Sequence, residues 1–235
     1  RNPAHYTGIY GHKPSFGIVP RCRLELPGMM AAGDLSVAGP LARCAEDLQF
    51  ELDIIAGPEA NDAVGWRLDL PKARRSHLAG FRVAAWLDDP DCPVDSQVLA
   101  RLEQTVSALE AVGVTVDTEA RPDFDLRSSN RIYRSLLNAT SARGMLGDVI
   151  AKVNGQEDAI PLEDAGEKPT VARTSALRHR EWLHLSEARA QIRAKWNLFF
   201  RDYDVLLTPV TPVAAIEHLH IPTRERTILV NGEAH

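Results

Sequence analysis

The stretch GIYGHKPSFG at residues 8–17 combines glycines, a lysine and a serine, the residue types of a phosphate-binding loop. Such a loop needs the order GxxxxGK[ST], with the lysine and the hydroxyl residue leading directly into a helix. Here the gap from Gly8 to Gly11 is too short, and Pro14 separates the lysine from the serine. Proline also lacks the N–H group that a phosphate cradle requires. The stretch therefore does not predict nucleotide binding.

Other candidate chemical groups are incomplete as well. His218 and His220 would share one face of an extended segment, but the sequence indicates no third metal ligand, and we interpret them as part of a surface loop. His179 and His184 lack the i,i+4 spacing of an HExxH zinc site. Ser36 lies between glycines without the GxSxG spacing of a nucleophile elbow, and no SxxK pattern occurs. Taken alone, the residues define no complete active site.

The composition excludes some classes of binding partner. The 235 residues carry a formal net charge of −5 at pH 7, which predicts no broad attraction for nucleic acid or an anionic membrane. No apolar run reaches the roughly 18 residues that cross a bilayer. Three widely spaced cysteines are typical of reduced thiols, which favours a cytoplasmic protein.

Hydrophobic spacing along the first half predicts an α/β fold. Residues 41–55 repeat apolar positions at steps of three and four, which predicts a helix with Pro40 in its first turn. Residues 81–87 read as a buried strand, residues 95–112 as a helix capped by Asp95, and residues 114–117 as a second strand. Strand, helix and strand in this order predict a parallel pair with a crossover helix.

The remaining elements follow the same logic. The N-terminal part reads as loop with a short helix or strand at 4–10. Beyond residue 120, we predict a helix over 124–152, a loop over 154–169, a long helix over 170–202 and a buried strand over 204–208. The apolar stripe of the long helix is interpreted as core. We expect residues 1–235 to form one domain without a separate second one.

Four stretches change the functional reading when taken in order. They are RNPA at 1–4, GIYGHKPSFGIVP at 8–20, AGPLARCAEDL at 38–48 and DYDVLLTPVTP at 202–212. Together they resemble the amidase signature family, the serine amidohydrolases of the Ser–cis-Ser–Lys type. The resemblance implies an α/β/α sandwich with a mixed, largely parallel sheet flanked by helices. It also implies that this chain is the middle-to-C-terminal portion of the family's domain.

The resemblance places the catalytic groups outside these residues. In the family, the nucleophilic serine lies two residues before the arginine of RxPA, which here is Arg1. The cis-serine, the general-base lysine and the glycine-rich oxyanion hole lie further upstream, and Lys13 is not the catalytic lysine. No catalytic residue can therefore be carried onto this sequence, and we expect the chain alone to be inactive.

What can be carried over is the support of the site. Arg1, Asn2 and Pro3 match the segment that follows the nucleophile loop, where a guanidinium can brace backbone carbonyls and a carboxylate. Thr208 and Pro209 match a strand-end motif that lies along the acyl-substrate channel in the family.

A second group of candidate pocket residues comes from the predicted helix 124–152. Tyr133, Leu137 and Asn138 fall in a variable helical region that often lines the pocket of the family, and plain helix packing is the alternative.

The resemblance implies an amidase that hydrolyses a small carboxylic amide through a serine acyl-enzyme, without a metal or an organic cofactor. Two alternatives stay open: an amidotransferase A-type subunit, which passes ammonia to a charged tRNA, and a folded domain without catalysis. We also expect open strand edges in this piece of a sheet, which favour a homodimer.

Overall fold

The computed structural model describes residues 1–20, 31, 33–144, 174–221 and 225–235. The chain divides into two compact units, of which unit 1 comprises Arg1–Ala120 and Tyr203–His235 and unit 2 comprises Arg121–Asp202. Unit 2 is thus inserted between two segments of unit 1. The predicted loop at 154–169 lies outside the described residues.

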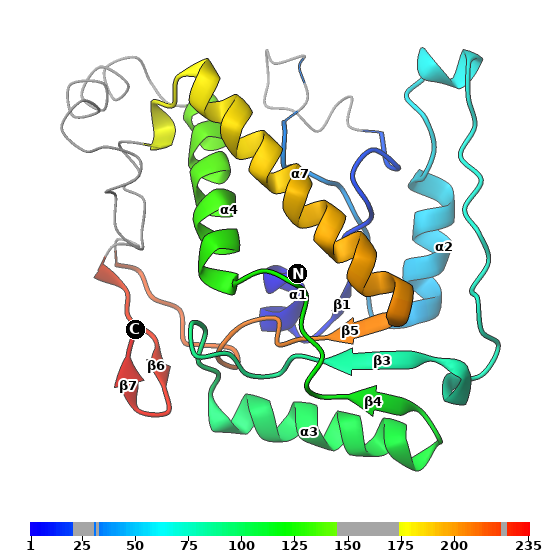
Figure 1. The fold of residues 1–235 in the computed structure, drawn as a ribbon, viewed down its shortest axis with the longest axis vertical. Coiled ribbons are helices and arrows are strands. Elements are labelled where there is room, and N and C mark those ends of the chain that lie inside the picture. Colours follow the sequence, from blue (N-terminus) through cyan, green and yellow to red (C-terminus); the bar gives the residue numbers. More distant parts are fainter. Residues whose placement is uncertain (21–30, 32, 145–173, 222–224) are drawn as a thin grey trace. The chain divides into compact units, whose positions relative to one another are not determined.

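Unit 1 contains a three-stranded parallel sheet (Figure 1). The strands are β3 (Arg82–Ala85), β4 (Thr115–Asp117) and β5 (Val205–Leu207), in the order β4-β3-β5. Three of the four residues of the central strand β3 are buried. The helix α3 (Ser96–Ala111) connects β3 to β4 and contacts β4. The predicted parallel pair with its crossover helix is confirmed.

Local signals explain where α3 begins and ends. The Oδ1 atom of Asp95 accepts a hydrogen bond of 3.0 Å from the backbone N–H of Gln97, as expected for an N-cap residue. Gly113 follows the helix with a φ of 87°, a left-handed conformation that glycine adopts readily. Both boundaries agree with the sequence-based prediction.

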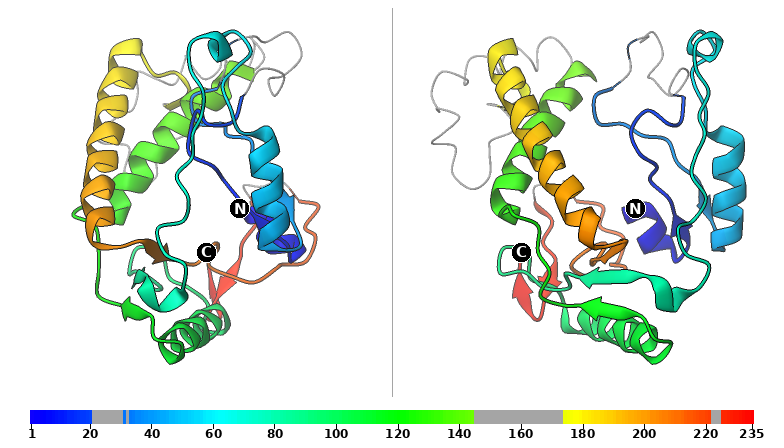
Figure 2. Two further views of the ribbon diagram at one scale, coloured as in Figure 1. Left: turned by 90° about the vertical axis from the view of Figure 1, so that its right-hand side faces the viewer. Right: turned by 45° about the vertical axis from the view of Figure 1, so that its right-hand side comes forward.

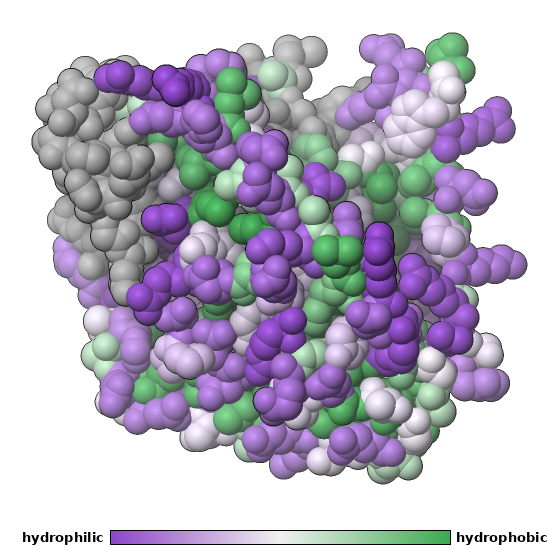
Figure 3. Space-filling model, viewed as in Figure 1, coloured by the Kyte–Doolittle hydropathy of each residue, from purple (hydrophilic) through white to green (hydrophobic). Residues whose placement is uncertain are grey.

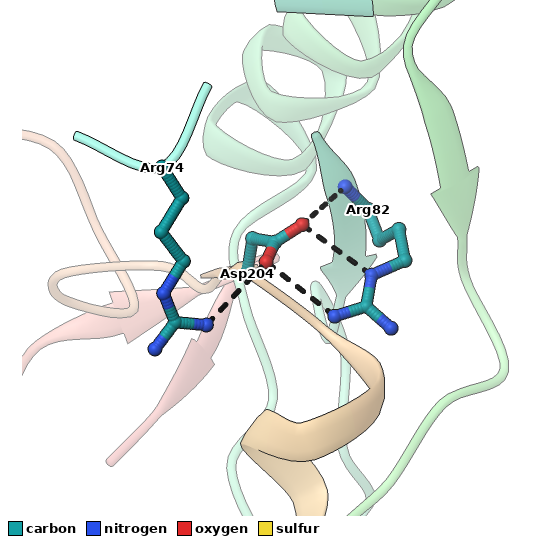
Figure 4. Close-up of polar contacts among 3 residues, drawn as sticks. All are labelled: Arg74, Arg82 and Asp204. Carbon is teal, nitrogen blue, oxygen red and sulfur yellow. Dashed lines mark hydrogen bonds and ion pairs between the residues drawn. The ribbon is translucent and has the colours of Figure 1, made fainter. Parts of the chain in front are cut away.

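A carboxylate fastens β5 to the start of β3. The backbone N–H of Arg82 donates to Oδ2 of Asp204 at 3.0 Å, and the Arg82 guanidinium approaches both carboxylate oxygens at 3.4 Å (Figure 4). Arg74 lies within 3.8 Å of the same carboxylate. The hydrogen bond from the Arg82 backbone, followed by that from its side chain, holds the pKa of Asp204 below its ordinary value.

The N-terminal part of unit 1 differs from the prediction around residue 41. The helix α1 (Asn2–Thr7) precedes the strand β1 (Tyr10–Gly11), which pairs antiparallel with β2 (Leu41–Ala42). The helix α2 therefore spans Ala45–Ile55, and Cys44 is its N-cap. Pro40 lies before β2 and not in a helical turn, because its carbonyl accepts the backbone N–H of His12 across the strand pair.

The buried face expected for residues 41–55 is also corrected. Leu52 is buried, but Leu48 and Ile55 are half-buried, Ala45 is exposed, and Leu41 is 50% exposed in β2. On the face shown in Figure 3, hydrophobic residues interrupt the hydrophilic surface at several places.

A β-hairpin closes unit 1. Its strands β6 (Leu229–Val230) and β7 (Glu233–Ala234) are joined by Asn231 and Gly232, whose φ values are 52° and 84°. Two left-handed residues of the type Asn-Gly form the tight turn that matches the twist of a hairpin. The remaining short elements are 3₁₀ turns, η1 (Asp62–Val64) and η2 (Leu78–Gly80).

Unit 2 is built on two packed helices, α4 (Leu126–Ser141) and α7 (His179–Asp202), which lie side by side in Figures 1 and 2. The 3₁₀ turn η3 (Ala142–Gly144) follows α4. Aromatic rings pack edge to face or stacked within this unit; they belong to Phe124, Trp196, Phe199 and Phe200.

The long helix begins later than predicted. Residues 176–178 are not helical, and α7 begins at His179. The backbone N–H of Arg178 donates to Oε2 of Glu181 at 2.8 Å, the back-bond of a capping box, and this local contact sets the start. The predicted extension of the other helix to residue 152 lies outside the described residues beyond residue 144.

Candidate functional site

The carboxyl ends of the three parallel strands meet at one edge of the sheet in unit 1. Ala85 of β3 pairs with Leu207 of β5, and Ala84 pairs with Asp117 at the end of β4. In open α/β sheets, ligands bind beyond this edge, where the loops that leave the strands form a crevice. We therefore take this edge as the candidate functional site.

The segment after β5, residues 208–213, is bonded to the segment after β3. The backbone N–H of Trp86 donates to the carbonyl of Leu207 at 2.9 Å. The backbone N–H of Asp95 donates to the carbonyl of Pro212 at 2.8 Å. The segment is thereby fixed near both of its ends.

The same segment contacts α1. The Nε2 atom of His5 lies 3.0 Å from the carbonyl oxygen of Val213. The buried hydroxyl of Thr211 donates to that oxygen at 2.6 Å. Thr208 is exposed and Pro209 is half-buried at the end of β5. The predicted channel residues thus lie in a segment that is bonded to the helix at the start of the chain.

The predicted support residues Arg1, Asn2 and Pro3 form the beginning of α1 and are exposed. The carbonyl of Arg1 accepts the backbone N–H of His5 at 3.0 Å. Within the part of the chain that the structure describes, the Arg1 guanidinium makes no hydrogen bond or ion pair. Its role in bracing a nucleophile loop stays a prediction, and the exposed position leaves the guanidinium accessible to such a loop.

The stretch that first suggested a phosphate loop packs against the GPLAR segment. Gly8 ends α1 in a left-handed conformation with a φ of 68°, and Tyr10–Gly11 form β1. A Cβ atom at Gly39 would lie 2.0 Å from the carbonyl oxygen of His12 and 2.6 Å from Cδ of Pro14. The absence of a side chain at Gly39 therefore permits close packing of the GPLAR segment against the stretch at 8–17.

Tyr133, Leu137 and Asn138 belong to α4 in unit 2, whereas Thr208 and Pro209 belong to unit 1. The Tyr133 side chain is 50% exposed and Leu137 is half-buried. The Nδ2 atom of Asn138 donates to the hydroxyl of Thr174 at 2.8 Å. This bond gives Asn138 a packing role within unit 2; whether these three residues also line a pocket stays a prediction.

The described residues contain no activated nucleophile of a familiar kind. Burial, followed by the charges of Asp89 and Asp88, raises the pKa of the Cys92 thiol. At Cys44, the backbone N–H of Asp47 lowers the pKa, but the carboxylates of the first helical turn and desolvation outweigh it and raise the pKa overall. Both shifts disfavour the reactive thiolate.

Nor do the described residues supply the serine–lysine chemistry that the resemblance implies. No lysine among them hydrogen-bonds to a serine, and Lys195 pairs with Asp123 at 3.5 Å. No group of three or more His, Cys, Asp or Glu side chains among the described residues is arranged to hold a metal ion. At the edge itself, the exposed Thr208 follows directly after β5, whereas the Thr211 hydroxyl is buried and bonded to the carbonyl of Val213.

Sequence reasoning missed the contacts that shape this scaffold. No sequence pattern marks His5 or Asn231 as a site-building residue, yet each bonds a segment more than 130 residues away. The side chain of Asn231 accepts the backbone N–H of Ser96 at 2.8 Å and donates to the carbonyl of Val94 at 3.1 Å. An Asn-Gly pair indicates a tight turn, but no local pattern indicates the tertiary partners of Asn231.

The parallel sheet and the loops at its carboxyl edge are typical of α/β proteins whose binding sites are built from the loops that follow the strands. A sequence profile of the family described as Amidase matches residues 1–230. The chain therefore belongs to the amidase signature family.

Individual relatives carry two kinds of name. The A-type subunit of glutamyl-tRNA(Gln) amidotransferase from Symbiobacterium thermophilum is 26% identical over 234 residues, which covers 92% of this chain and 47% of that protein. Indoleacetamide hydrolase of Bradyrhizobium diazoefficiens is 28% identical over 216 residues, which covers 90% of this chain and 39% of that protein. The chain thus spans about half the length, or less, of these curated relatives.

Solved structures share the fold. A bacterial aryl acylamidase of the amidase signature family superposes with a TM-score of 0.64 at 19% identity, covering 100% of this chain and 48% of that one. The A-type subunit of glutamyl-tRNA(Gln) amidotransferase from Thermotoga maritima gives a TM-score of 0.66 at 19% identity, covering 95% and 47%. The predicted α/β fold with a parallel sheet flanked by helices is confirmed. None of the described helices is both long and apolar enough to cross a membrane.

Proposed function

We propose that the chain is part of an amidase that hydrolyses a small carboxylic amide to an acid and ammonia or an amine. The observation that carries this proposal is the family match over residues 1–230, together with the strand-end segment 208–213 that is bonded to α1. Indoleacetamide hydrolase and the aryl acylamidase are named for the same class of reaction.

In the proposed mechanism, a serine ahead of Arg1 attacks the amide carbonyl and forms an acyl-enzyme. A lysine and a cis-serine move the proton to the leaving amine, backbone N–H groups stabilise the oxyanion, and water releases the acid. The residues of this chain contribute the scaffold. α1 fixes the start of the chain relative to 208–213, and the exposed Thr208 follows directly on the carboxyl end of β5.

The proposal makes the 235-residue chain inactive by itself, because the three catalytic groups lie outside it. The test is a fluorophosphonate label, applied to the purified chain and to a longer protein that includes the residues ahead of Arg1. We expect the label on the longer protein at the serine two residues before Arg1, and none on the chain alone. A label on a serine of residues 1–235 would overturn this assignment.

An intact mass belongs to the same experiment. A mass near 25.9 kDa identifies the sample as the chain alone. For such a sample we expect no release of ammonia from indoleacetamide and none of an arylamine from an aryl acylamide, and for the longer protein we expect turnover of both. Turnover by the chain alone would contradict the proposed inactivity.

The second candidate is an amidotransferase A-type subunit, because the first curated relatives carry that name at 26% identity. Such a subunit hydrolyses glutamine and delivers ammonia to a partner. The two candidates separate in one comparison: a stand-alone amidase turns over an aryl amide without a partner, whereas an amidotransferase subunit depends on its partner and prefers glutamine. We propose a cytoplasmic location for either, from the wide spacing of the three cysteines.

A further inference from the structure

Charge is divided unevenly between the two units. In the sequence, unit 2 (residues 121–202) has 14 basic and 11 acidic side chains, a net charge of +3. Unit 1 has 13 basic and 21 acidic side chains, a net charge of −8. The net charge of −5 for the whole chain predicts no attraction for polyanions, but it is the sum of an acidic unit 1 and a basic unit 2. Such asymmetry within a chain is a feature of proteins that bind nucleic acids or membranes.

The positive charge of unit 2 is concentrated on α4. This helix contains three arginines and no acidic residue. Arg127, Arg131 and Arg134 follow one another at steps of four and three, so they share one face of the helix. All three are exposed, and Asn130 lies exposed on the same face. We name these four residues the arginine face.

The arginine face costs the helix some stability. Like charges at i,i+4 repel, and Arg127 lies in the first turn, where the helix dipole disfavours cations. Asp125 approaches the first of the three arginines, and it caps the helix through Ser128 at 2.6 Å. Among the described residues, the side chains of Arg131 and Arg134 make no hydrogen bond or ion pair. The helix thus carries three neighbouring guanidinium groups that repel one another. No anionic group within the described ranges pairs with the last two.

The shape of the face selects the kind of anion. At 1.5 Å per residue, the three arginines span about 10 Å along the helix axis, comparable with three phosphate repeats of one nucleic-acid strand. Arginine and asparagine are among the side chains that contact phosphates most often.

Other partners fit the face less well. A protein interface needs a buried aromatic or aliphatic anchor at its centre, and an anionic membrane needs apolar side chains that insert. The four residues of the arginine face include no apolar anchor, Leu136 is fully buried on the other side of α4, and the one exposed aromatic ring of this helix, Tyr133, lies beside the face and not at its centre. We infer that the arginine face of α4 binds the phosphate backbone of a nucleic acid. This inference does not depend on the proposed amidase activity.

The test is the anisotropy of a fluorescein-labelled duplex of about 20 base pairs, titrated with the 235-residue chain between about 50 and 200 mM NaCl. Three phosphate contacts predict that the affinity falls about 40-fold over this range, from a slope of about −0.9 per contact. The variant with Arg127→Gln, Arg131→Gln and Arg134→Gln should lose this salt-dependent binding. The variant in which lysine replaces the same three arginines keeps the positive charge and should retain the salt dependence. Its binding would show that the glutamine variant fails because it lost charge and not because it unfolded.

A matched control removes the same charge from unit 1. Arg43, Arg67 and Arg101 are exposed there, and the variant that replaces them with Gln should bind within twofold of the wild type. The inference is overturned if the wild type does not bind the duplex or if the control variant weakens binding as much as the α4 variant. It is also overturned if a polyglutamate peptide or a phosphatidylserine vesicle binds α4 as tightly as the duplex does, because the partner would then belong to another class.

Discussion

Asp204 and Arg82 bond each other through both backbone and side chains. The N–H of Asp204 donates to the carbonyl of Arg82 at 2.8 Å, and the N–H of Arg82 donates to the Asp204 carboxylate at 3.0 Å. The carboxylate is 5% exposed and also receives the Arg82 guanidinium (Figure 4). The pair therefore fixes the register at the point where the chain returns from unit 2 to the sheet.

This relationship predicts a pH-dependent stability. Because the folded pKa of Asp204 is lowered, its contribution is present above the ordinary carboxylate pKa of about 4 and is lost as the pH falls through the lower, folded value. We expect Asp204→Asn to lower the free energy of unfolding at pH 7, with a difference from the wild type that shrinks below pH 4. Urea unfolding at pH 7, 5 and 3.5 measures it.

Asp123→Asn is the control, because the Asp123 side chain is 98% exposed and its ion pair with Lys195 is long, at 3.5 Å. Exposed pairs of this kind contribute little. A difference for Asp204→Asn that stays constant from pH 7 to pH 3.5 would contradict a lowered pKa of Asp204 in the folded protein.

A second prediction concerns the contact between the stretch at 8–17 and Gly39. An alanine Cβ at this position would lie 2.0 Å from the carbonyl oxygen of His12, so the backbone must move. We expect Gly39→Ala to destabilise the protein by about 3 kcal/mol, at the upper end of ordinary overpacking. Gly65→Ala is the control, because its Cβ meets its nearest atom at 3.7 Å. Equal midpoints of thermal unfolding for the two variants would sink the prediction.

The elements of the sheet could be predicted because their signals are local. The apolar run of β3, the Asp95 cap and Gly113 all act within a few residues of the structure that they set. The start of α2 could not, because Leu41 pairs with Gly11, thirty residues away, and this tertiary contact overrides the helical pattern. A single sequence does not show such a partner.

The candidate site divides in the same way. Thr208 and Pro209 could be placed at a strand end from the pattern DVLLTP, because a buried strand followed by proline ends there. The bond from His5 to Val213 spans 208 residues and leaves no periodic signal. The catalytic groups implied by the family lie outside these residues, so no reading of this sequence could place them.

Asn231 gives a third prediction. Its left-handed backbone suits glycine, but its side chain also bonds Ser96 and Val94, and its N–H donates to Asp95. Asn231→Gly keeps the turn and removes two side-chain hydrogen bonds, so we expect a loss of about 1–2 kcal/mol in the free energy of unfolding. Chemical denaturation measures it.

The matched control for this prediction keeps the hairpin and changes a neighbour without such bonds. Glu233 in β7 is exposed, so Glu233→Gln should leave the free energy of unfolding within about 0.5 kcal/mol of the wild type. If Asn231→Gly proved as stable as the wild type, the side chain would be a bystander and the turn alone would hold the hairpin.

A fourth prediction lies where the chain re-enters unit 1. The hydroxyl of Tyr203 donates to the carboxylate of Asp117, so the last residue of β4 is bonded to the first residue of the returning segment. Tyr203→Phe removes this bond to a charged acceptor, and we expect a loss of about 1.5–3 kcal/mol. Tyr133→Phe is the control, since the half-exposed Tyr133 hydroxyl has no partner among the described residues. Equal urea midpoints for the two variants would show that the Tyr203 bond does not stabilise unit 1.

The last prediction concerns self-association. Within the described residues, β4 and β5 are the edges of the three-stranded sheet, and Phe50 and Ile54 on α2 are each 66% exposed. Phe50 and Ile54 are one helical turn apart, and burying such side chains yields about 1.5–3 kcal/mol each. We therefore expect the chain to form dimers or larger species whose fraction rises with concentration in sedimentation velocity. Replacing both residues with serine should shift the distribution toward the monomer, whereas Val64→Ser, at a site 92% exposed, should not. A wild-type chain that stays monomeric at all concentrations would show that these apolar side chains and strand edges do not drive association.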